Sequence, residues 1–137
     1  MTAWAHLPNA RHIDWVLASL KSDPQKWHAA RDAARDATRT AARTAARDAA
    51  WDVAWGATRG AAWDAAWDAA RDAAWDARAA LIAWDAAWDA CAALIAWDDC
   101  ANLLDMPTDA VRLLAGAGHH PAVLLLPAVI VRNGETS

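Results

Sequence analysis

The chain has 137 residues, of which 41 are Ala, 11 are Trp and none is Tyr or Phe. A formal net charge of −4 argues against a basic nucleic-acid-binding protein, and two Cys are too few for a disulfide framework. No stretch of charged and then apolar residues stands at the start of the sequence, so we expect no leader, and no apolar run reaches the roughly 18 residues of a membrane span. We therefore expect one cytoplasmic domain covering residues 1–137, which is long enough to bury a core.

Residues 1–22 are predicted to form an N-terminal arm and an amphipathic helix. Asn9 can cap this helix. Apolar residues then recur at i, i+3, i+4 and i+7, as they do on one face of a helix: Ile13, Val16, Leu17 and Leu20. The helix is expected to end before Pro24, which suits the first position of a second helix capped by Asp23.

Residues 23–78 are dominated by a four-residue repeat, [Trp/Arg]-Asp-Ala-Ala, which we call the tetrad repeat. Its Ala content predicts helix. Because a helix has 3.6 residues per turn, the first position of each tetrad advances by about 40° around the axis. No flat partner can cover such a stripe for long, so we expect short helices that cross steeply, or a long helix wrapped by neighbours. The two glycines Gly56 and Gly60 predict a turn.

Charge is distributed unevenly along the tetrad repeat. Residues 26–47 hold six basic residues against two Asp, whereas residues 48–99 hold ten Asp against three Arg. A turn near 56–60 would bring two rows of opposite charge together, within one molecule or between copies. These rows are the candidate interaction surface: Arg35, Arg39, Arg43 and Arg47, and Asp64, Asp68, Asp72 and Asp76.

Each charged row has an alternative interpretation. The Asp row rises about 6 Å per step, near the phosphate spacing of one DNA strand, so mimicry of DNA is conceivable. The Asp row rotates around the helix and has Arg71 beside it. The simpler explanation is therefore that these Asp residues form a solvated face or internal ion pairs. The Arg row, with Trp27 and Trp51 at its ends, could bind phosphates and stack on bases. It contains no aromatic residue itself, so nucleic acid is not the expected partner.

Residues 79–106 are predicted to form the core helix. They are the most apolar part of the helical region, and the motif Ala-Leu-Ile-Ala-Trp-Asp occurs twice, at 80–85 and 93–98. Within 107–131, Thr108 can cap a short helix that ends at Ala115. The apolar run 121–131 is either a helix kinked at Pro127 or an extended segment. Residues 132–137 are expected to be a frayed tail.

No residue pattern indicates catalysis. His119 and His120 could bind a metal with Asp105 or Asp109, but a cap or loop role is the simpler one. Cys91 and Cys100 show no metal-binding spacing and are expected to be small buried side chains. Six Trp could stack on a flat ligand but are expected to form the core, as the chain's only aromatic type: Trp63, Trp67, Trp75, Trp84, Trp88 and Trp97. We therefore expect no enzyme, no cofactor and no metal.

Four segments joined to the tetrad repeat carry a resemblance: HIDWVL at 12–17, LIAWDDC at 94–100, LLDMP at 103–107 and GHHPAVLLLPAVI at 118–130. Together they resemble uncharacterised Ala/Trp/Arg/Asp-rich tetrad-repeat proteins of phage and mobile-element genomes. More remotely, the chain is similar to Ala-rich helical proteins described as immunity proteins. The resemblance implies an all-helical, non-enzymatic accessory protein, which would act in the host cytoplasm if it is phage-encoded.

These expectations combine into one hypothesis and one alternative. The fold is predicted to be all-α, a compact bundle of Ala/Trp-rich helices, one or two of which could be long. The function is predicted to be binding or inhibition of a protein partner, without a membrane. The alternative is a structural scaffold that self-assembles through the stripes of the tetrad repeat.

Overall fold

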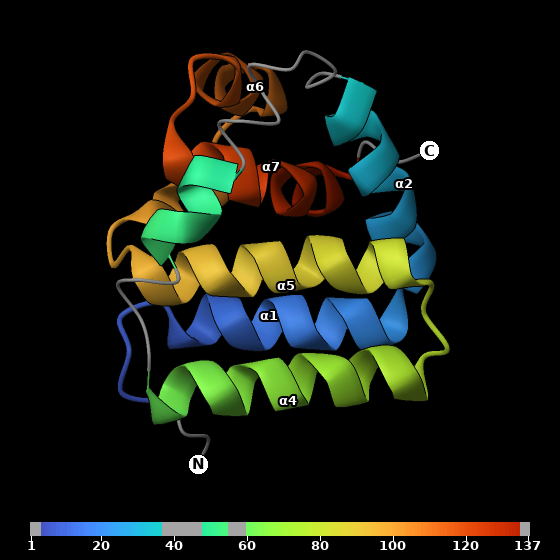
Figure 1. Cartoon of the computed structure of the whole chain (residues 1–137). Coiled ribbons are helices and arrows are strands. Elements are labelled where there is room, and N and C mark those ends of the chain that lie inside the picture. The colour runs from blue at the N-terminus through green and yellow to red at the C-terminus, as the bar shows by residue number, and fades with distance from the viewer. Residues whose placement is uncertain (1–3, 37–47, 55–59, 135–137) are drawn as a thin grey trace.

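The structure, a computed structural model, describes residues 4–36, 48–54 and 60–134 (Figure 1). Helices and no strand occur in these ranges, which confirms the predicted all-α bundle. The elements are α1 Ala10–Ser22, α2 Pro24–Asp36, α4 Ala61–Asp76, α5 Leu81–Ala96, the 3-10 helix η1 Cys100–Asp105, α6 Thr108–Gly116 and α7 His120–Asn133. Residues 48–54 are also helical.

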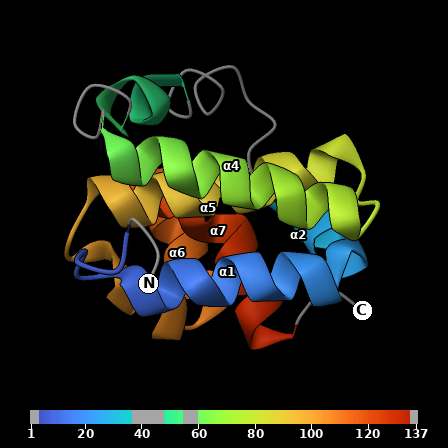
Figure 2. The same cartoon turned by 90° about the horizontal axis from the view of Figure 1, so that it is seen from below.

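Helix α5 lies at the centre of the bundle. On one side it packs against α1 and α4, which also contact each other, and on the other it packs against α2 and α7 (Figures 1 and 2). Helix α6 packs on the outside of α7. The eleven residues buried on α5 run without interruption from Ala86 to Ile95, after Ala83. A helix with apolar residues on every side must be covered by neighbours on every side. The burial of α5 therefore confirms the core position predicted for this segment.

The core helix is shorter than the range 79–106 that the sequence predicts. It ends at Ala96, because Trp97 adopts an extended conformation with φ −123° and ψ 107°, and η1 then forms from Cys100. Two consecutive carboxylates, Asp98 and Asp99, follow this end. Asp is a weak helix former, and negative charge is unfavourable at a helix C-terminus. Residues 79–106 are therefore two helical elements joined by a turn.

Asn9 holds the end of α5 instead of capping α1. It occupies the N-cap position of α1, but its side chain makes no capping hydrogen bond. Its amide Nδ2 donates to the carbonyl oxygens of Leu94 and Trp97 at 2.9 and 3.0 Å. The side chain thus binds two carbonyls at the end of the helix, where carbonyl groups lack intrahelical partners; that of Trp97 also accepts from the backbone N–H of Cys100.

The predicted boundary at Pro24 is confirmed, because α1 ends at Ser22 and α2 begins at Pro24. Most of the predicted turn at 56–60 lies outside the described residues, but α4 begins directly after Gly60. Helix α2 runs steeply across α5, whereas α4 lies alongside α1 and α5 (Figures 1 and 2). The crossing expected for the tetrad repeat is therefore seen in α2 and not in α4.

The C-terminal apolar run is helical, which decides between the two alternatives. Pro121 lies in the first turn of α7, where a missing N–H costs nothing, and the helix continues through Pro127. The ring Nδ1 of His119 accepts a hydrogen bond from the backbone N–H of Ala122 at 3.3 Å, which confirms its capping role. Gly134, with φ 71°, ends α7 in the left-handed conformation that glycine adopts without strain.

Two expectations near the C-terminus are wrong. Thr108 is the first residue of α6 and not its cap. Its hydroxyl instead accepts a hydrogen bond from Asn133 Nδ2 at 2.8 Å. Arg132 and Asn133 belong to α7 and not to a frayed tail, and Arg132 forms an ion pair with Asp105 at 3.2 Å.

Candidate interaction surface

The predicted Asp row lies on α4 and faces solvent. All four carboxylates, Asp64, Asp68, Asp72 and Asp76, are exposed. The guanidinium of Arg71 lies between two of them, 3.8 Å from Asp68 and 4.0 Å from Asp72. These are long contacts on the surface, and such pairs contribute under about 1 kcal/mol each. The Asp row is therefore largely free to interact with another molecule.

The predicted Arg row lies mostly beyond what the structure describes. Arg35 belongs to α2, whereas Arg39, Arg43 and Arg47 lie outside the described residues. Helix α2 packs on α5 and α7. Whether the Arg row meets the Asp row of α4 thus stays a prediction.

Arg31, one turn before the Arg row, is neutralised inside the protein. Its Nη1 lies 2.9 Å from the Asp89 carboxylate, and its Nη2 lies 3.5 Å from that of Asp85. The indole N–H of Trp51 donates to the second Asp89 oxygen at 2.9 Å. Asp89 is only 1% exposed, so this cluster joins α2 and residues 48–54 to α5 from within. It is a structural element of the core.

The rotation of the tetrad repeat explains why α4 carries both core and surface Trp. The first positions of its four tetrads are Trp63, Trp67, Arg71 and Trp75. Trp63 is buried and Trp67 half-buried, while Arg71 and Trp75 are exposed. Three steps of about 40° turn this position by about 120°, from the core to the solvent. The buried row of α4 continues instead on Ala66, Ala70 and Ala74, which matches the helical period better.

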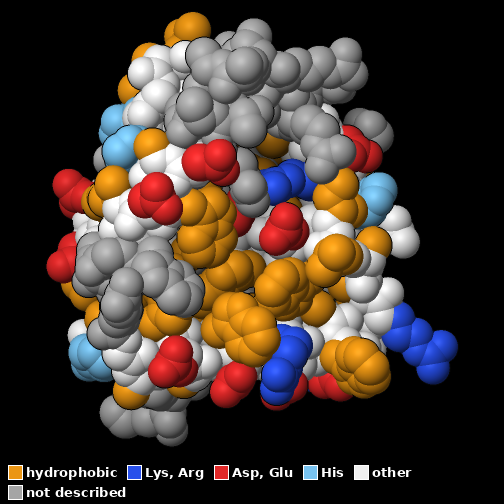
Figure 3. All heavy atoms as spheres, viewed as in Figure 1, with side chains coloured by type: hydrophobic (Ala, Val, Ile, Leu, Met, Phe, Trp, Pro, Cys, Tyr) orange, Lys and Arg blue, Asp and Glu red, His pale blue; other side chains and the backbone are white. Residues whose placement is uncertain are grey.

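This rotation exposes the large side chain of Trp75, and a second large apolar side chain, Leu81, is exposed at the same hollow. Trp75, at the end of α4, is 83% exposed, and Leu81, at the start of α5, is 77% exposed. Hydrophobic side chains gather on this face of the molecule, with charged side chains around them (Figure 3). Contiguous exposed apolar area on a folded chain is typical of an interaction site.

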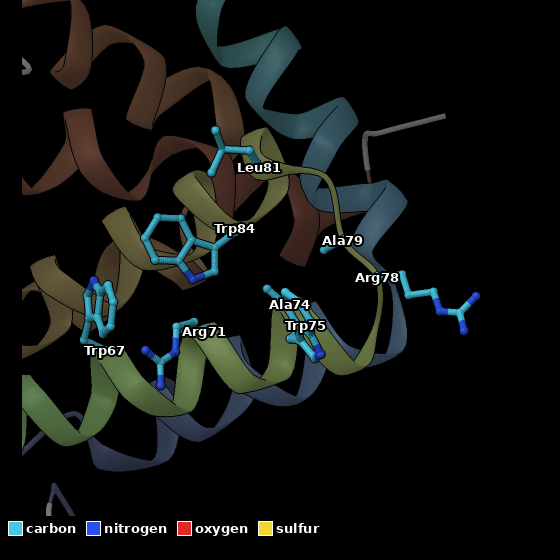
Figure 4. A pocket seen from close by; sticks show the side chains of 8 residues that line it. All are labelled: Trp67, Arg71, Ala74, Trp75, Arg78, Ala79, Leu81 and Trp84. Carbon is cyan, nitrogen blue, oxygen red and sulfur yellow. The ribbon is translucent and has the colours of Figure 1, made fainter.

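A hollow of about 760 Å³ lies beside these two side chains (Figure 4). We call it the α4–α5 groove; it is lined by Trp67, Arg71, Ala74, Trp75, Arg78, Ala79, Leu81 and Trp84. Trp67 and Trp84 form its inner wall and meet edge to face, with ring centroids 5.9 Å apart. The volume is within the range of ligand pockets, and the lining is mostly apolar.

The polar groups of the groove are few. Arg71 lies over the Trp67 ring, 5.2 Å from its centroid, which is a cation–π distance. The guanidinium of Arg78 points away from the other lining side chains (Figure 4). The indole N–H of Trp84 is buried and has no acceptor among the described residues. A buried donor without a partner is unfavourable by about 1 to 3 kcal/mol, so the N–H of Trp84 is an unsatisfied polar group in the inner wall of the groove.

Two cysteines and a possible metal site are the candidate chemically reactive groups. No group of three or more His, Cys, Asp or Glu in the described ranges is placed to hold a metal ion. Cys91 and Cys100 are both buried and free, and Cys100 lies in η1 and not on the core helix as expected. Burial raises the pKa of Cys100 to about 12, and it raises the pKa of Cys91 even further. A thiol that stays protonated is a poor nucleophile.

The α4–α5 groove was not identified from the sequence. Trp75 was assigned to the core with the other Trp, because each tetrad looks alike. The signal that could have found it is the 40° rotation counted from Trp63, together with the loss of the repeat after Trp75.

Comparison of the chain with protein-family models, curated proteins and solved structures gave no match. Among the described residues, no helix is both long and apolar enough to cross a membrane. Function is therefore inferred from the surface of the molecule itself.

Proposed function

We propose that this chain is a non-enzymatic helical accessory protein that binds a protein partner through the α4–α5 groove. The observation that carries the proposal is the exposure of Trp75 and Leu81 beside an apolar hollow. A large apolar side chain gains about 1.5 to 3 kcal/mol when it is fully covered. Trp is also the residue type most enriched among the residues that dominate binding energy at protein interfaces.

The form of the groove favours a protein segment as its occupant. Its floor is built from two helices joined by a short connection, and its charged lining residues are Arg71 and Arg78. The carboxylates of Asp68 and Asp72 lie next to Arg71. An apolar centre with a polar rim is the usual anatomy of a protein interface. A partner helix can place its apolar face into such a groove.

Site-specific photo-crosslinking tests the proposal. A benzophenone amino acid is placed at Trp75 in cells that naturally express the chain, and in a second strain at Leu113 of α6. Leu113 is as exposed as Leu81, at 77%, but lies on a different face of the bundle. We expect a discrete crosslinked partner from position 75 and not from position 113. The purified partner should then bind the wild-type chain, and Leu81→Asp should weaken its affinity at least tenfold while Leu113→Asp leaves it unchanged.

The same experiment separates the alternative of a self-assembling scaffold. A crosslinked product of twice the chain mass, with a particle mass that grows over a hundredfold range of concentration, would support the scaffold and contradict the proposal. Equal crosslinking from positions 75 and 113 would show that the groove is not a specific surface.

A further inference from the structure

A second hollow adjoins the α4–α5 groove on the side of the α4 N-terminus. It has a volume of about 480 Å³ and is lined by Trp63, Asp64, Trp67 and Asp68. Trp67 lines both hollows, so the two are neighbours on one surface. We call the second one the acidic hollow.

The acidic hollow is a direct product of two consecutive tetrads. In the sequence Trp-Asp-Ala-Ala-Trp-Asp, the two Trp are separated by one turn of α4, and so are the two Asp. Two indoles and two carboxylates therefore line the same small space. Indole faces attract cations, as the guanidinium of Arg71 over the half-buried Trp67 ring illustrates, and carboxylates bind the N–H groups of guanidinium or ammonium ions. A cationic side chain is the chemistry that both kinds of group recognise.

Among the residues that the structure describes, the surroundings carry a net negative charge. Four exposed carboxylates of the Asp row stand there against two guanidinium groups, those of Arg71 and Arg78. Arg71 is already shared between Asp68 and Asp72. Asp64 and Asp76 form no ion pair with any residue that the structure describes. A basic partner would neutralise this surface, and its approach would be accelerated by the charge.

We propose that the segment bound by the α4–α5 groove is a basic amphipathic helix that places an Arg in the acidic hollow. The proposal rests on the proposed function and specifies the partner. Arg fits better than Lys, because its planar guanidinium can stack on an indole and bind a carboxylate through two parallel N–H groups. The apolar face of the same helix covers Trp75 and Leu81.

The positions of the two hollows set the spacing of the partner residues. The acidic hollow is built from residues 63–68 of α4, and the α4 side of the groove from residues 67–75. Their centres are about five to seven residues apart along α4, or roughly 8 to 10 Å at 1.5 Å per residue. A partner helix lying along α4 spans that distance in up to two turns. Its Arg and its main apolar anchor are therefore expected about seven residues apart, in either order along the partner, with a further apolar residue between them.

A second copy that presents this same surface is a poorer occupant. The same surface would face itself, bringing net negative charge against net negative charge, and each chain carries −4 overall. Like charges facing each other in an interface oppose association. Charge complementarity therefore favours a different, basic partner.

Selection from a random library of displayed 16-residue peptides tests the inference. The purified chain is used as bait, and peptides that also bind the Trp75→Glu/Leu81→Glu variant are removed. We expect the enriched peptides to carry a net positive charge, with an Arg and an apolar residue about seven positions apart in either order and a further apolar residue between them. Synthetic versions should bind with an affinity that falls at least tenfold for the chain variant Asp64→Asn/Asp68→Asn.

A matched control removes two other exposed carboxylates, Asp32 of α2 and Asp109 of α6. The Asp32→Asn/Asp109→Asn variant should bind the peptides within about twofold of the wild-type chain. Replacing the peptide Arg by Glu should abolish binding, and replacing it by Lys should weaken it. Far-ultraviolet circular dichroism checks that each chain variant is folded, as expected for changes at exposed positions.

The outcomes separate this inference from the proposed function. If no enriched peptide distinguishes the wild-type chain from the Trp75→Glu/Leu81→Glu variant, the groove is not the binding surface and both proposals fail. If groove-dependent peptides are neutral or acidic, or bind the Asp64→Asn/Asp68→Asn variant equally well, only the basic partner is wrong. A wild-type dimer that dissociates in the Trp75→Glu/Leu81→Glu variant would assign the surface to a second copy and overturn the inference.

Discussion

The guanidinium of Arg31 on α2 lies 2.9 Å from the carboxylate of Asp89 on α5, and both side chains are largely buried. The indole N–H of Trp51 occupies the other oxygen of the same carboxylate. One carboxylate of α5 thus joins two separate parts of the tetrad repeat to the core helix. An ion pair of this kind adds little stability by itself, because desolvation opposes the attraction. Removal of one member of the pair, however, leaves the charge of the other member buried without its partner.

The first prediction concerns this pair. Asp89→Asn should lower the free energy of unfolding by about 3 kcal/mol, because Arg31 keeps its buried charge and loses its closest counter-ion. Chemical denaturation followed by circular dichroism measures the change. Asp85→Asn is the matched control: Asp85 is half-exposed and lies 3.5 Å from the same guanidinium. It should change the free energy by less than about 1 kcal/mol. Equal effects of the two substitutions would contradict the assigned role of Asp89.

The second prediction separates two roles of Asn9. Asp is as good an N-cap as Asn, so a capping role predicts that Asn9→Asp is harmless and that Ala is worse. In the structure the amide instead donates to the carbonyls of Leu94 and Trp97. A carboxylate there would face two carbonyl oxygens. We therefore expect Asn9→Asp to be more destabilising than Asn9→Ala, which should lower the free energy of unfolding by about 1 to 3 kcal/mol. Thermal and chemical denaturation of both variants give the order, and the reverse order would restore the capping role.

Composition and local signals predicted much of the fold. Ala content predicted helices, Pro24 predicted the boundary between α1 and α2, and the Leu and Ile residues predicted α5 as the core helix. These features depend on residues close in sequence, or on total apolarity, and need no knowledge of neighbouring helices.

The α4–α5 groove depends on the phase of the repeat as well as on its period, because the tetrads are nearly identical in sequence. Asp85 and Asp89 occur in the same Trp-Asp-Ala context, yet Asp85 is half-exposed and Asp89 is buried. Trp63 and Trp75 differ in the same way. The period of the repeat gives the rotation between tetrads but not its starting phase. That phase is determined by the helices that pack on α4 and α5, which are distant in sequence.

The third prediction concerns the two thiols. Burial raises the pKa of Cys100 to about 12, and burial, aided by the charge of Asp14, raises the pKa of Cys91 beyond its ordinary range. In the unfolded chain the pKa of each thiol should be about 8.5. The folded state then binds more protons than the unfolded state at alkaline pH. The contribution of the two thiols to the free energy of unfolding is therefore fully present below about pH 8.5. It is lost as pH rises toward 12, by about 1.4 kcal/mol per pH unit for each thiol.

Urea denaturation at a series of pH values between 8 and 11 measures this slope. The chain has no Tyr, so no phenol titrates in the same range. The Cys91→Ala/Cys100→Ala variant is the control and should show a much smaller slope. A thiol reagent should also react slowly with the native wild-type chain at pH 8 and fast after unfolding. An equal slope in wild type and variant would mean that the thiols are not protected.

The last prediction tests the opposite charged rows. Replacing Arg39 and Arg43 by Glu should lower the melting temperature or change the oligomeric state, because the Arg row needs carboxylates from elsewhere in the protein or from another copy. Reversing Asp68 and Asp72 to Arg in the same molecule should restore part of the loss. Each exposed pair contributes under about 1 kcal/mol, so the rows would select the register of contact more than its strength.

The structure supplies the control for that charge swap. Asp68 and Asp72 flank Arg71, so reversing them alone places three positive charges together and should destabilise α4. If the Arg39→Glu/Arg43→Glu change restores stability to the variant with Asp68 and Asp72 reversed, the two rows meet. Each change is unfavourable among its own neighbours, so a gain in stability must come from contact between the rows. If the Arg-to-Glu variant instead keeps its melting temperature and assembly but loses binding to an added polynucleotide, the Arg row is a phosphate-binding surface. The Asp row would in that case be left to the partner bound at the α4–α5 groove.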